Sequence, residues 1–362
     1  MRYFKRVLAL TVMSAMLFIP AFSFAGSGKE NAKPISFKDH LGRQIELDAV
    51  PKRVASVATP GGSMVVTIVN DGETLVATTP KSNSGLRNGV LTEFFPGLNN
   101  VVSNIVSNNN TPNIEELLYL KPDVVIQWAR KTKSIEAMEV AGLTVVALKY
   151  AKTDIAKTWL STLGIMMDKS DKANDILQWH QSAYERIISK TGSIGENKKP
   201  KVLYMMSPER AAGPLSHVQF FIDTAGAQNA LVSKEKFIYI DPEMLLKANP
   251  DIIWIAGYNM KFFPETIYNN PIFSEVNAVK NRRIYKVPVG GGRWDPPNQE
   301  LPLACEWYTR TVHPDLLDGS IRDSIKKAYQ VLYGKIPSKE QLDKILRVKI
   351  NSGADAYEVI SR

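Results

Sequence analysis

The chain has 362 residues, 44% of them hydrophobic, and a formal net charge of +9; this length is enough for two domains with separate cores. Its basic residues are scattered, without a basic stripe or interleaved aromatic side chains, and this argues against a nucleic-acid partner. The mild positive excess favours an anionic small ligand. The single cysteine, Cys305, excludes an internal disulfide.

The first 25 residues have the pattern of a cleavable export signal. Arg2, Lys5 and Arg6 precede an apolar run, and the segment ends in Ser23-Phe24-Ala25. We expect cleavage after Ala25 and release into the periplasm, because no cysteine stands at the cleavage point to carry a lipid anchor. No later stretch is apolar for the roughly 18 residues that a spanning helix needs.

Residues 26–152 predict a first α/β lobe. A hairpin turning at Leu41-Gly42-Arg43 is expected first, followed by a buried strand at 53–58. Further apolar strands follow within 71–80, 113–128 and 135–150, the last two each behind a helical pattern. Short buried strands that alternate with helices favour a parallel sheet covered by helices.

Residues 153–199 predict a bridging helix and a linker. Apolar residues recur at helical spacing, and neither proline nor glycine interrupts them until Gly192, so we expect one helix of about 24 residues from residue 169, about 36 Å long. Its apolar positions are Ala173, Ile176, Leu177, Ala183, Tyr184, Ile187 and Ile188. Residues 200–362 then alternate strands and helices again and end in helices. The expected fold is two α/β lobes with mainly parallel sheets, joined by a single long helix, with a ligand cleft between them.

Five segments together resemble the periplasmic binding proteins of iron-siderophore, haem and cobalamin ABC importers. They are FKDHLGRQIELDAVPKRVASV, EELLYLKPDVVIQW, DTAGAQNAL, LKANPDIIWIAG and FSEVNAVKNRRIYKVP, in the order of the family, and they cover most of residues 35–305. The resemblance implies two lobes bridged by a rigid helix. It also implies a receptor that captures a metal complex and delivers it to a permease dimer in the inner membrane, without covalent chemistry. We expect a monomer without a resident cofactor.

Aromatic and cationic side chains recur where the predicted strands end, which is where ligands bind in open α/β sheets. Guanidinium groups bind oxygen pairs and aromatic faces pack against an organic shell. The predicted contacts are Gly61, Arg87, Trp128, Arg130 and Tyr150 in the first lobe and Arg210, His217, Tyr258, Gly292, Arg293 and Trp294 in the second. Each has a structural alternative; for example, Arg293 pairs with Asp295 and Trp294 packs in the core if this loop is only a cap.

The run VPVGGGRWDPP at 287–297 has the glycines of a phosphate loop but no following Gly-Lys-Ser/Thr, so nucleotide binding is excluded. No paired-histidine, His-Glu-x-x-His or Cys-x-x-Cys spacing is present, so no dedicated zinc site is expected; bare iron held by tyrosines and a histidine stays open but is not indicated by any motif. Among the histidines, His217 is the one expected near the cleft.

Glu115 and Glu243 occupy matching places, each at the start of a helix that precedes a Pro-Asp strand. A carboxylate there stabilises the helix dipole by about 0.3–1 kcal/mol. The resemblance implies a further role, because one glutamate on each lobe of these proteins docks with arginines of the permease. In the first lobe Glu116 is an equal alternative to Glu115.

The cationic and aromatic mix favours a ferric siderophore or a similar anionic chelate. Haem, cobalamin, a nickel or cobalt chelate, or a free oxyanion such as molybdate or tungstate stay open, the last because a glycine run with one arginine suits a tetrahedral anion. A chelatase-like enzyme requires a histidine that faces a carboxylate in the cleft. Only His217 could serve, and the sequence offers it no evident acidic partner.

Overall fold

The computed structural model describes residues 34–107, 111–150 and 155–362, all of which belong to one compact unit, Lys33–Arg362. The expected export signal, residues 1–25, lies outside the described residues. Within the described ranges, no helix combines the length and the apolar character that crossing a membrane requires. The lobe boundaries near residues 152 and 200 stay predictions, and the lobes are defined below by their two sheets.

The first lobe is built on a parallel sheet with the strand order β4-β3-β5-β6. Both faces of the sheet are covered, which explains why its strands are nearly unbroken apolar runs. In β5, for example, Val124 and Ile126 belong to one buried cluster and Val125 to another. The strands are β3 (Val54–Ser56), β4 (Leu75–Thr78), β5 (Val124–Trp128) and β6 (Val145–Leu148).

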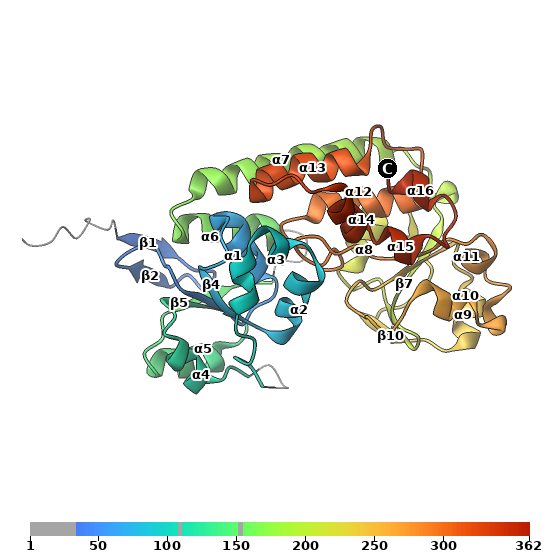
Figure 1. Ribbon diagram of the computed structural model, residues 1–362. Helices are drawn as coiled ribbons and strands as arrows, with labels where there is room; N and C mark the ends of the chain where they lie inside the picture. The colour runs from blue at the N-terminus through green and yellow to red at the C-terminus, as the bar shows by residue number, and fades with distance from the viewer. Residues whose placement is uncertain (1–33, 108–110, 151–154) are drawn as a thin grey trace, which may run out of the picture. The chain divides into compact units, whose positions relative to one another are not determined.

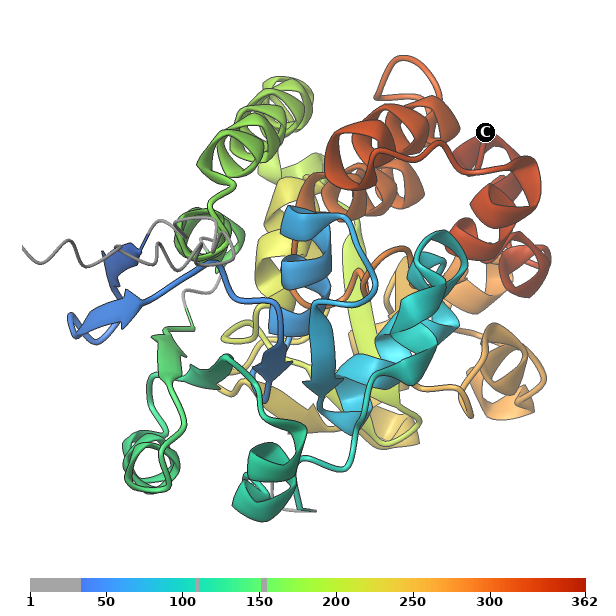
Figure 2. The same cartoon turned by 60° about the vertical axis from the view of Figure 1, so that its left-hand side comes forward.

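A hairpin and five α-helices complete the first lobe, which Figure 2 brings to the front. The predicted turn at 41–43 is confirmed, because β1 (Ile35–Lys38) pairs antiparallel with β2 (Gln44–Leu47). Helix α1 packs on one face of the sheet, and α4 and α5 pack on the other. The helices are α1 (Gly61–Val69), α2 (Pro80–Asn88), α3 (Leu91–Phe94), α4 (Ile114–Leu120) and α5 (Thr132–Val140), with the 3-10 turn η1 (Pro96–Asn100).

The second lobe contains a mixed sheet with the order β10-β8-β7-β11-β12, in which β9 also pairs with β7. Strands β7, β11 and β12 are parallel, as expected, and β9 also pairs parallel with β7, whereas β8 pairs antiparallel with both β7 and β10. The sequence analysis did not predict β8, β9 or β10. The strands are β7 (Lys201–Ser207), β8 (Arg210–Ala212), β9 (Gln228–Asn229), β10 (Phe237–Tyr239), β11 (Ile252–Ile255) and β12 (Ile284–Lys286).

Short helices connect the strands of the second lobe. They are α8 (Val218–Thr224), α9 (Pro242–Ala248), α10 (Pro264–Tyr268), η4 (Pro271–Phe273) and α11 (Asn277–Lys280). Helix α9 matches the expected helix before β11 and begins at Asp241, whose side chain caps the Met244 N–H at 2.8 Å. Capping of this kind satisfies an N–H group that has no partner within the helix.

The bridging helix is confirmed as α7 (Ser170–Thr191), a continuous helix of 22 residues. It follows α6 (Ile155–Met166) and is capped at Gly192, where the uninterrupted pattern ends. Its apolar face packs against α6, α12 (Leu301–Val312) and α13 (Ile321–Tyr333); Figure 1 shows α13 beside α7. The turn η3 (Glu196–Lys198) leads into β7, and the chain ends with α14 (Lys339–Leu346), α15 (Val348–Asn351) and α16 (Tyr357–Ile360).

The C-terminal helices make a second connection to the first lobe. The Phe94 ring of α3 packs against Tyr329 of α13 at 5.9 Å between centroids. Glu93 forms an ion pair of 2.6 Å with Lys344 of α14, and the Val90 N–H donates to the carbonyl of Gly290 at 3.2 Å. The two sheets are therefore tied together by α7 and again through the C-terminal segment.

Candidate ligand site

A cavity of about 560 Å³ lies between helix α2 and the strand ends of the second lobe. Met206 in β7, Tyr258 after β11 and Val289 after β12 line one wall, and Lys81 and Gly85 of α2 line the other. Ligands of open α/β sheets bind in the crevice at the carboxyl ends of the strands. The cavity therefore occupies the place expected for a ligand site.

Arg293 is the cation at the centre of this site. Its Nε donates to Asp295 Oδ1 at 3.0 Å, and its guanidinium carbon lies 4.7 Å from the centroid of the Tyr258 ring. Among the described residues Asp295 is the only hydrogen-bond partner of the Arg293 side chain. The terminal guanidinium nitrogens thus keep donor capacity that suits an oxygen-rich ligand.

Asp295 is buried and organises the polar groups around it. It accepts a hydrogen bond from the Tyr204 hydroxyl at 3.3 Å, and its backbone hydrogen-bonds to His217. Burial lowers the pKa of His217, outweighing the opposing effect of Asp295, so the imidazole is neutral at pH 7. Here the structure corrects the sequence analysis, which found no acidic group near His217. The Asp295 carboxylate is, however, already bound by Arg293 and Tyr204.

Further cations and aromatic rings surround the cavity. The Arg210 guanidinium carbon lies 5.0 Å from the centroid of Phe237, and both residues line the cavity. The Lys236 ammonium lies 5.5 Å from the same ring and 5.8 Å from Tyr150 of the first lobe. Tyr150 is 43% exposed and does not line the cavity itself. These contacts give the site a cationic and aromatic rim drawn from both lobes.

A pocket of about 30 Å³ adjoins the main cavity and shares Lys81, Gly85 and Arg293 with it. The hydroxyl-bearing residues Thr59, Ser63 and Ser82, Asn298, and the backbone at Gly291 and Gly292, also line it. Gly85 of α2 faces the second lobe, where a Cβ would make an ordinary van der Waals contact of 3.6 Å with Arg293 Cγ. The pocket has room for little more than one water-sized group.

The glycine loop that forms this pocket is held by Glu300, a buried residue just before α12. Its carboxylate accepts from the Gly291 N–H at 2.8 Å, from the Trp294 indole N–H at 2.6 Å and from the Tyr333 hydroxyl at 2.8 Å. A Cβ on Gly290 would lie 2.3 Å from the Tyr329 hydroxyl oxygen, so only glycine fits there. Burial raises the pKa of Glu300 in spite of these hydrogen bonds.

Comparisons with known proteins identify the family. The family model described as periplasmic binding protein matches residues 98–289, more than half of the chain. The chain belongs to the periplasmic binding protein family. A solved periplasmic solute binding protein from Veillonella parvula is 28% identical and superposes with a TM-score of 0.82, covering 88% of this chain and 98% of that chain.

Curated relatives of this binding protein include proteins with named ligands. The molybdate-binding protein MolA of Haemophilus influenzae is 22% identical over 253 residues, which span 62% of this chain and 72% of the relative. Its molybdate-bound structure superposes with a TM-score of 0.72 at 20% identity, covering 84% of this chain and 99% of that chain. The iron(3+)-hydroxamate-binding protein FhuD of Bacillus subtilis is 26% identical over 235 residues, 60% of this chain and 71% of the relative.

Several predicted contact residues of the binding protein come together at the two cavities, and others do not. Arg210, His217, Tyr258 and Arg293 line the main cavity, and Gly292 lines the adjoining pocket. The structure does not bring Trp294 there, because its side chain is fully buried and bound to Glu300. Gly61 begins α1 inside the first lobe, where a Cβ would lie 2.4 Å from Ser56 Oγ. Gly61 is thus explained by packing.

The remaining first-lobe candidates do not line either cavity. Trp128 packs against Trp159 at 5.1 Å and Tyr150 at 6.0 Å between centroids. The guanidinium carbon of Arg130, an exposed residue, lies 5.7 Å from the Trp128 ring. Arg87, on the exposed side of α2, donates to the Asn99 carbonyl at 2.9 Å. Other residues of α2 line the cavity, namely Pro80, Lys81, Ser84, Gly85 and Asn88.

Phe237 and Gly85 are among the cavity residues that were absent from the predicted set. Phe237 belongs to β10, one of the unpredicted antiparallel strands. The apolar run Phe237-Ile238-Tyr239-Ile240 is the signal that could have predicted this strand. Gly85 carried no recognisable signal, because a glycine inside a short helix indicates a close contact only once the opposite wall is known.

The paired glutamates occupy equivalent positions. Glu115 is the second residue of α4 and Glu243 the second residue of α9, and both are exposed. Glu116 is half-buried and its N–H is capped by Asn113 at 3.2 Å. The matching position and exposure therefore favour Glu115 over Glu116 as the counterpart of Glu243.

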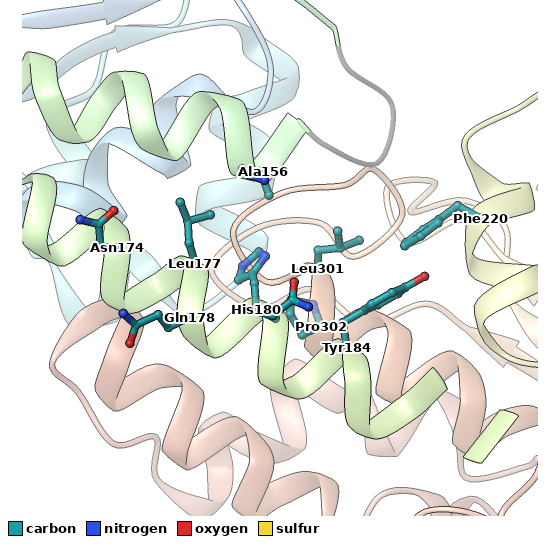
Figure 3. Close-up of a pocket in the computed structure, with 11 residues that line it drawn as sticks. Ala156, Asn174, Leu177, Gln178, His180, Tyr184, Phe220, Leu301 and Pro302 are labelled. Atoms are coloured by element: carbon teal, nitrogen blue, oxygen red, sulfur yellow. The ribbon is translucent and has the colours of Figure 1, made fainter. Parts of the chain in front are cut away.

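A second cavity, of about 610 Å³, lies among α6, α7, α8 and α12 (Figure 3). Leu177, His180 and Tyr184 project into it from α7, and Phe220 faces them from α8. Burial lowers the pKa of His180 to about 4, so this ring is uncharged near pH 7. The second cavity is larger, but it does not lie at the strand ends, and Lys157 is the only charged residue in its described lining.

The ligand sites contain no recognisable metal centre. Across residues 34–107, 111–150 and 155–362, no group of three or more His, Cys, Asp and Glu side chains is placed to hold a metal ion. Cys305 is buried in α12, where burial raises the pKa of its thiol well above the usual value.

Proposed function

We propose that this periplasmic binding protein captures an anionic metal chelate in the main cavity and delivers it to an ABC importer, acting by binding alone. The observation that carries the proposal is the charge of the cavity wall. Lys81, Arg210 and Arg293 line it, and its one acidic residue, Asp295, is already paired with Arg293. An oxygen-rich anion supplies the charge that this wall lacks, and Phe237 and Tyr258 offer faces for an organic shell.

A free oxyanion such as molybdate or tungstate is the second candidate, and a specific observation favours it. The adjoining pocket of about 30 Å³ combines side-chain hydroxyls, a lysine, an arginine and glycine backbone. One oxygen of a compact tetrahedral anion can enter this pocket while the rest of the anion lies in the main cavity, whereas a chelate occupies mainly the larger cavity. The two relatives differ in the same way, because one is named for molybdate, a free oxyanion, and the other for an iron(3+) hydroxamate, a metal chelate.

A ligand screen decides between these candidates. Thermal unfolding is followed with ferric citrate, a neutral ferric trihydroxamate, haem, cobalamin, a nickel chelate, molybdate and tungstate. Ferric citrate is expected to raise the melting temperature most, since a ligand at 100 times its Kd stabilises by about 2.7 kcal/mol. Stabilisation by molybdate and tungstate alone identifies the oxyanion candidate. If only cobalamin or the neutral ferric trihydroxamate stabilises the protein, the anionic site is wrong; ligand turnover contradicts action by binding alone. Haem carries two anionic propionates, so stabilisation by haem agrees with the anionic site.

We also propose that Glu115 and Glu243 dock on the permease. Both carboxylates are exposed, and no ion pair is recorded for either among the described residues. The double variant Glu115→Ala with Glu243→Ala is expected to keep its ligand affinity within about twofold, because the cavity lies elsewhere, and to lose uptake. Ligand affinity is measured by titration calorimetry and uptake in cells that lack the native gene.

The matched control removes the same charge elsewhere, at the exposed positions Glu185 of α7 and Glu358 of α16. That control is expected to support normal uptake. Normal uptake by the Glu115/Glu243 variant contradicts the docking proposal. Export by cleavage after Ala25, the monomeric state and the absence of a resident cofactor stay predictions.

A further inference from the structure

Two buried cations lie behind the floor of the main cavity. Lys286, in β12, is fully buried, and Arg347, between α14 and α15, is 7% exposed. Neither forms an ion pair within 4 Å among the described residues. Buried charges are normally paired, because an unpaired charge in a low-dielectric interior is costly. Over the described ranges, Lys286 and Arg347 are therefore two unpaired positive charges beside the main cavity.

The contacts of Arg347 reach the cavity floor through one residue. Its Nη2 donates to the carbonyl of Gly257 at 2.8 Å, and Gly257 lines the cavity. Its Nη1 is buried without a hydrogen-bond partner in the described structure. The backbone of Arg347 has φ of 53°, a conformation that non-glycine residues rarely adopt. This arginine is thus held behind the floor with part of its donor capacity unused.

Lys286 is held by neutral groups on the same side. Its ammonium donates to the carbonyl of Phe262 at 2.6 Å and to that of Asn259. Its backbone is fixed by Asn351, whose side chain accepts from the Lys286 N–H at 2.6 Å. Carbonyl oxygens satisfy the donors of an ammonium group but do not neutralise its charge.

Within the described part of the chain, one acidic group is placed to balance these cations. The charged groups that act on Lys286 are Arg347 and Asp295, and Asp295 also attracts Arg347. The same Asp295 carboxylate is bonded to Arg293 at 3.0 Å. One carboxylate therefore faces Arg293, Lys286 and Arg347, and the region lacks two negative charges when all three are protonated.

We propose that Arg347 and Lys286 are positioning charges that select a ligand carrying at least two negative charges, acting through the cavity floor without touching the ligand. The inference rests on the proposed function and narrows it to a dianionic or more highly charged chelate or oxyanion. Attraction across a buried floor is screened far less than in water, so charges that do not touch the ligand still contribute to its affinity.

The protonation of Lys286 supports this assignment. Burial, reinforced by Arg347, lowers the pKa of Lys286 to about 7, so near neutral pH the lysine is only partly charged without ligand. A bound anion favours the protonated form and raises this pKa. Ligand binding at pH 7 should consequently take up a fraction of a proton.

The test compares Arg347→Met, which removes the charge, with Arg347→Lys, which keeps it. The probes are ferric citrate and molybdate, with Kd measured by titration calorimetry. The methionine variant is expected to bind the anion about 10- to 30-fold more weakly, and the lysine variant within about threefold of the wild type. A merely structural role predicts equal losses in both variants. If Arg347→Met does not fold, Lys286→Met tests the other positioning charge by the same measurement.

A second readout is proton uptake, obtained by titrating at pH 7 in two buffers of different ionisation enthalpy. The wild type should take up part of a proton on binding, and Lys286→Met should take up none. The inference is wrong if Arg347→Met and Arg347→Lys bind the anion equally well, or if Lys286→Met takes up as much of a proton as the wild type. Either result leaves the proposed function intact. A wild-type protein that binds neither probe contradicts the proposed function, and the inference falls with it.

Discussion

Replacing Arg293 by alanine is expected to weaken binding of an anionic ligand about 100-fold, or ~3 kcal/mol, as is typical when one partner of a buried charged contact is removed. Arg293 lines both the main cavity and the adjoining pocket, and only its Nε is engaged by Asp295. The loss should therefore appear with a chelate and with a small oxyanion alike. Titration calorimetry with ferric citrate and molybdate measures the effect.

Arg87→Ala is the matched control. Arg87 belongs to α2, the helix that lines the main cavity, but its side chain is exposed, donates to the Asn99 carbonyl and lines neither cavity. This variant should bind like the wild type, and both variants should unfold cooperatively. An Arg293→Ala protein that keeps wild-type affinity would show that the glycine loop is only a cap and that the ligand binds elsewhere.

Replacing Glu300 by alanine is expected to destabilise the protein by about 3–5 kcal/mol, the range for breaking a buried charged network. The Gly291 N–H, the Trp294 indole and the Tyr333 hydroxyl would lose their common acceptor in an interior where water cannot replace it. Urea unfolding measures the loss. Glu300→Gln keeps one acceptor oxygen and should lose less. Equal stability of the alanine variant and the wild type would contradict the role given to this carboxylate.

The same residue predicts a pH dependence. Because burial raises the pKa of Glu300 above its usual value of 4.5, the folded state binds a proton more tightly than the unfolded state. The contribution to stability is therefore fully present below pH 4.5 and is lost as the pH rises through the folded pKa. From pH 4 upward, the melting temperature of the wild type should therefore fall more steeply than that of Glu300→Gln. Equal dependence of the two melting temperatures on pH would show that another group is responsible.

The sequence predicts elements whose pattern is local. The turn at 41–43, the buried strands and helix α7 could be predicted because their periodicity lies within one element. Strand β8 was missed because the three residues Arg210–Ala212 are too short for a periodic signal, whereas the short apolar run that contains β10 was not interpreted as a strand. Strand β8 pairs with β7 and β10 pairs with β8, and no local pattern contains these tertiary contacts.

The site could be predicted only in part, for a similar reason. Strand ends predicted which loops face the cavity, and Arg293 and Tyr258 lie there. The direction of a side chain within a loop is not encoded locally, so Trp294 was expected at the cleft although Glu300 holds it inside. Arg347 is distant from Gly257 in the sequence, and the two residues meet only in the folded protein, where the arginine donates to the Gly257 carbonyl.

The contact of the C-terminal helices with the first lobe has a consequence for the order of folding. Synthesis delivers α1 and α3 early, whereas α13, which covers α1 and packs Tyr329 against Phe94, is among the last segments to emerge. The first lobe therefore cannot bury its full apolar surface as an independent nascent domain. Until the final residues are released, that surface is a site for chaperones and for aggregation.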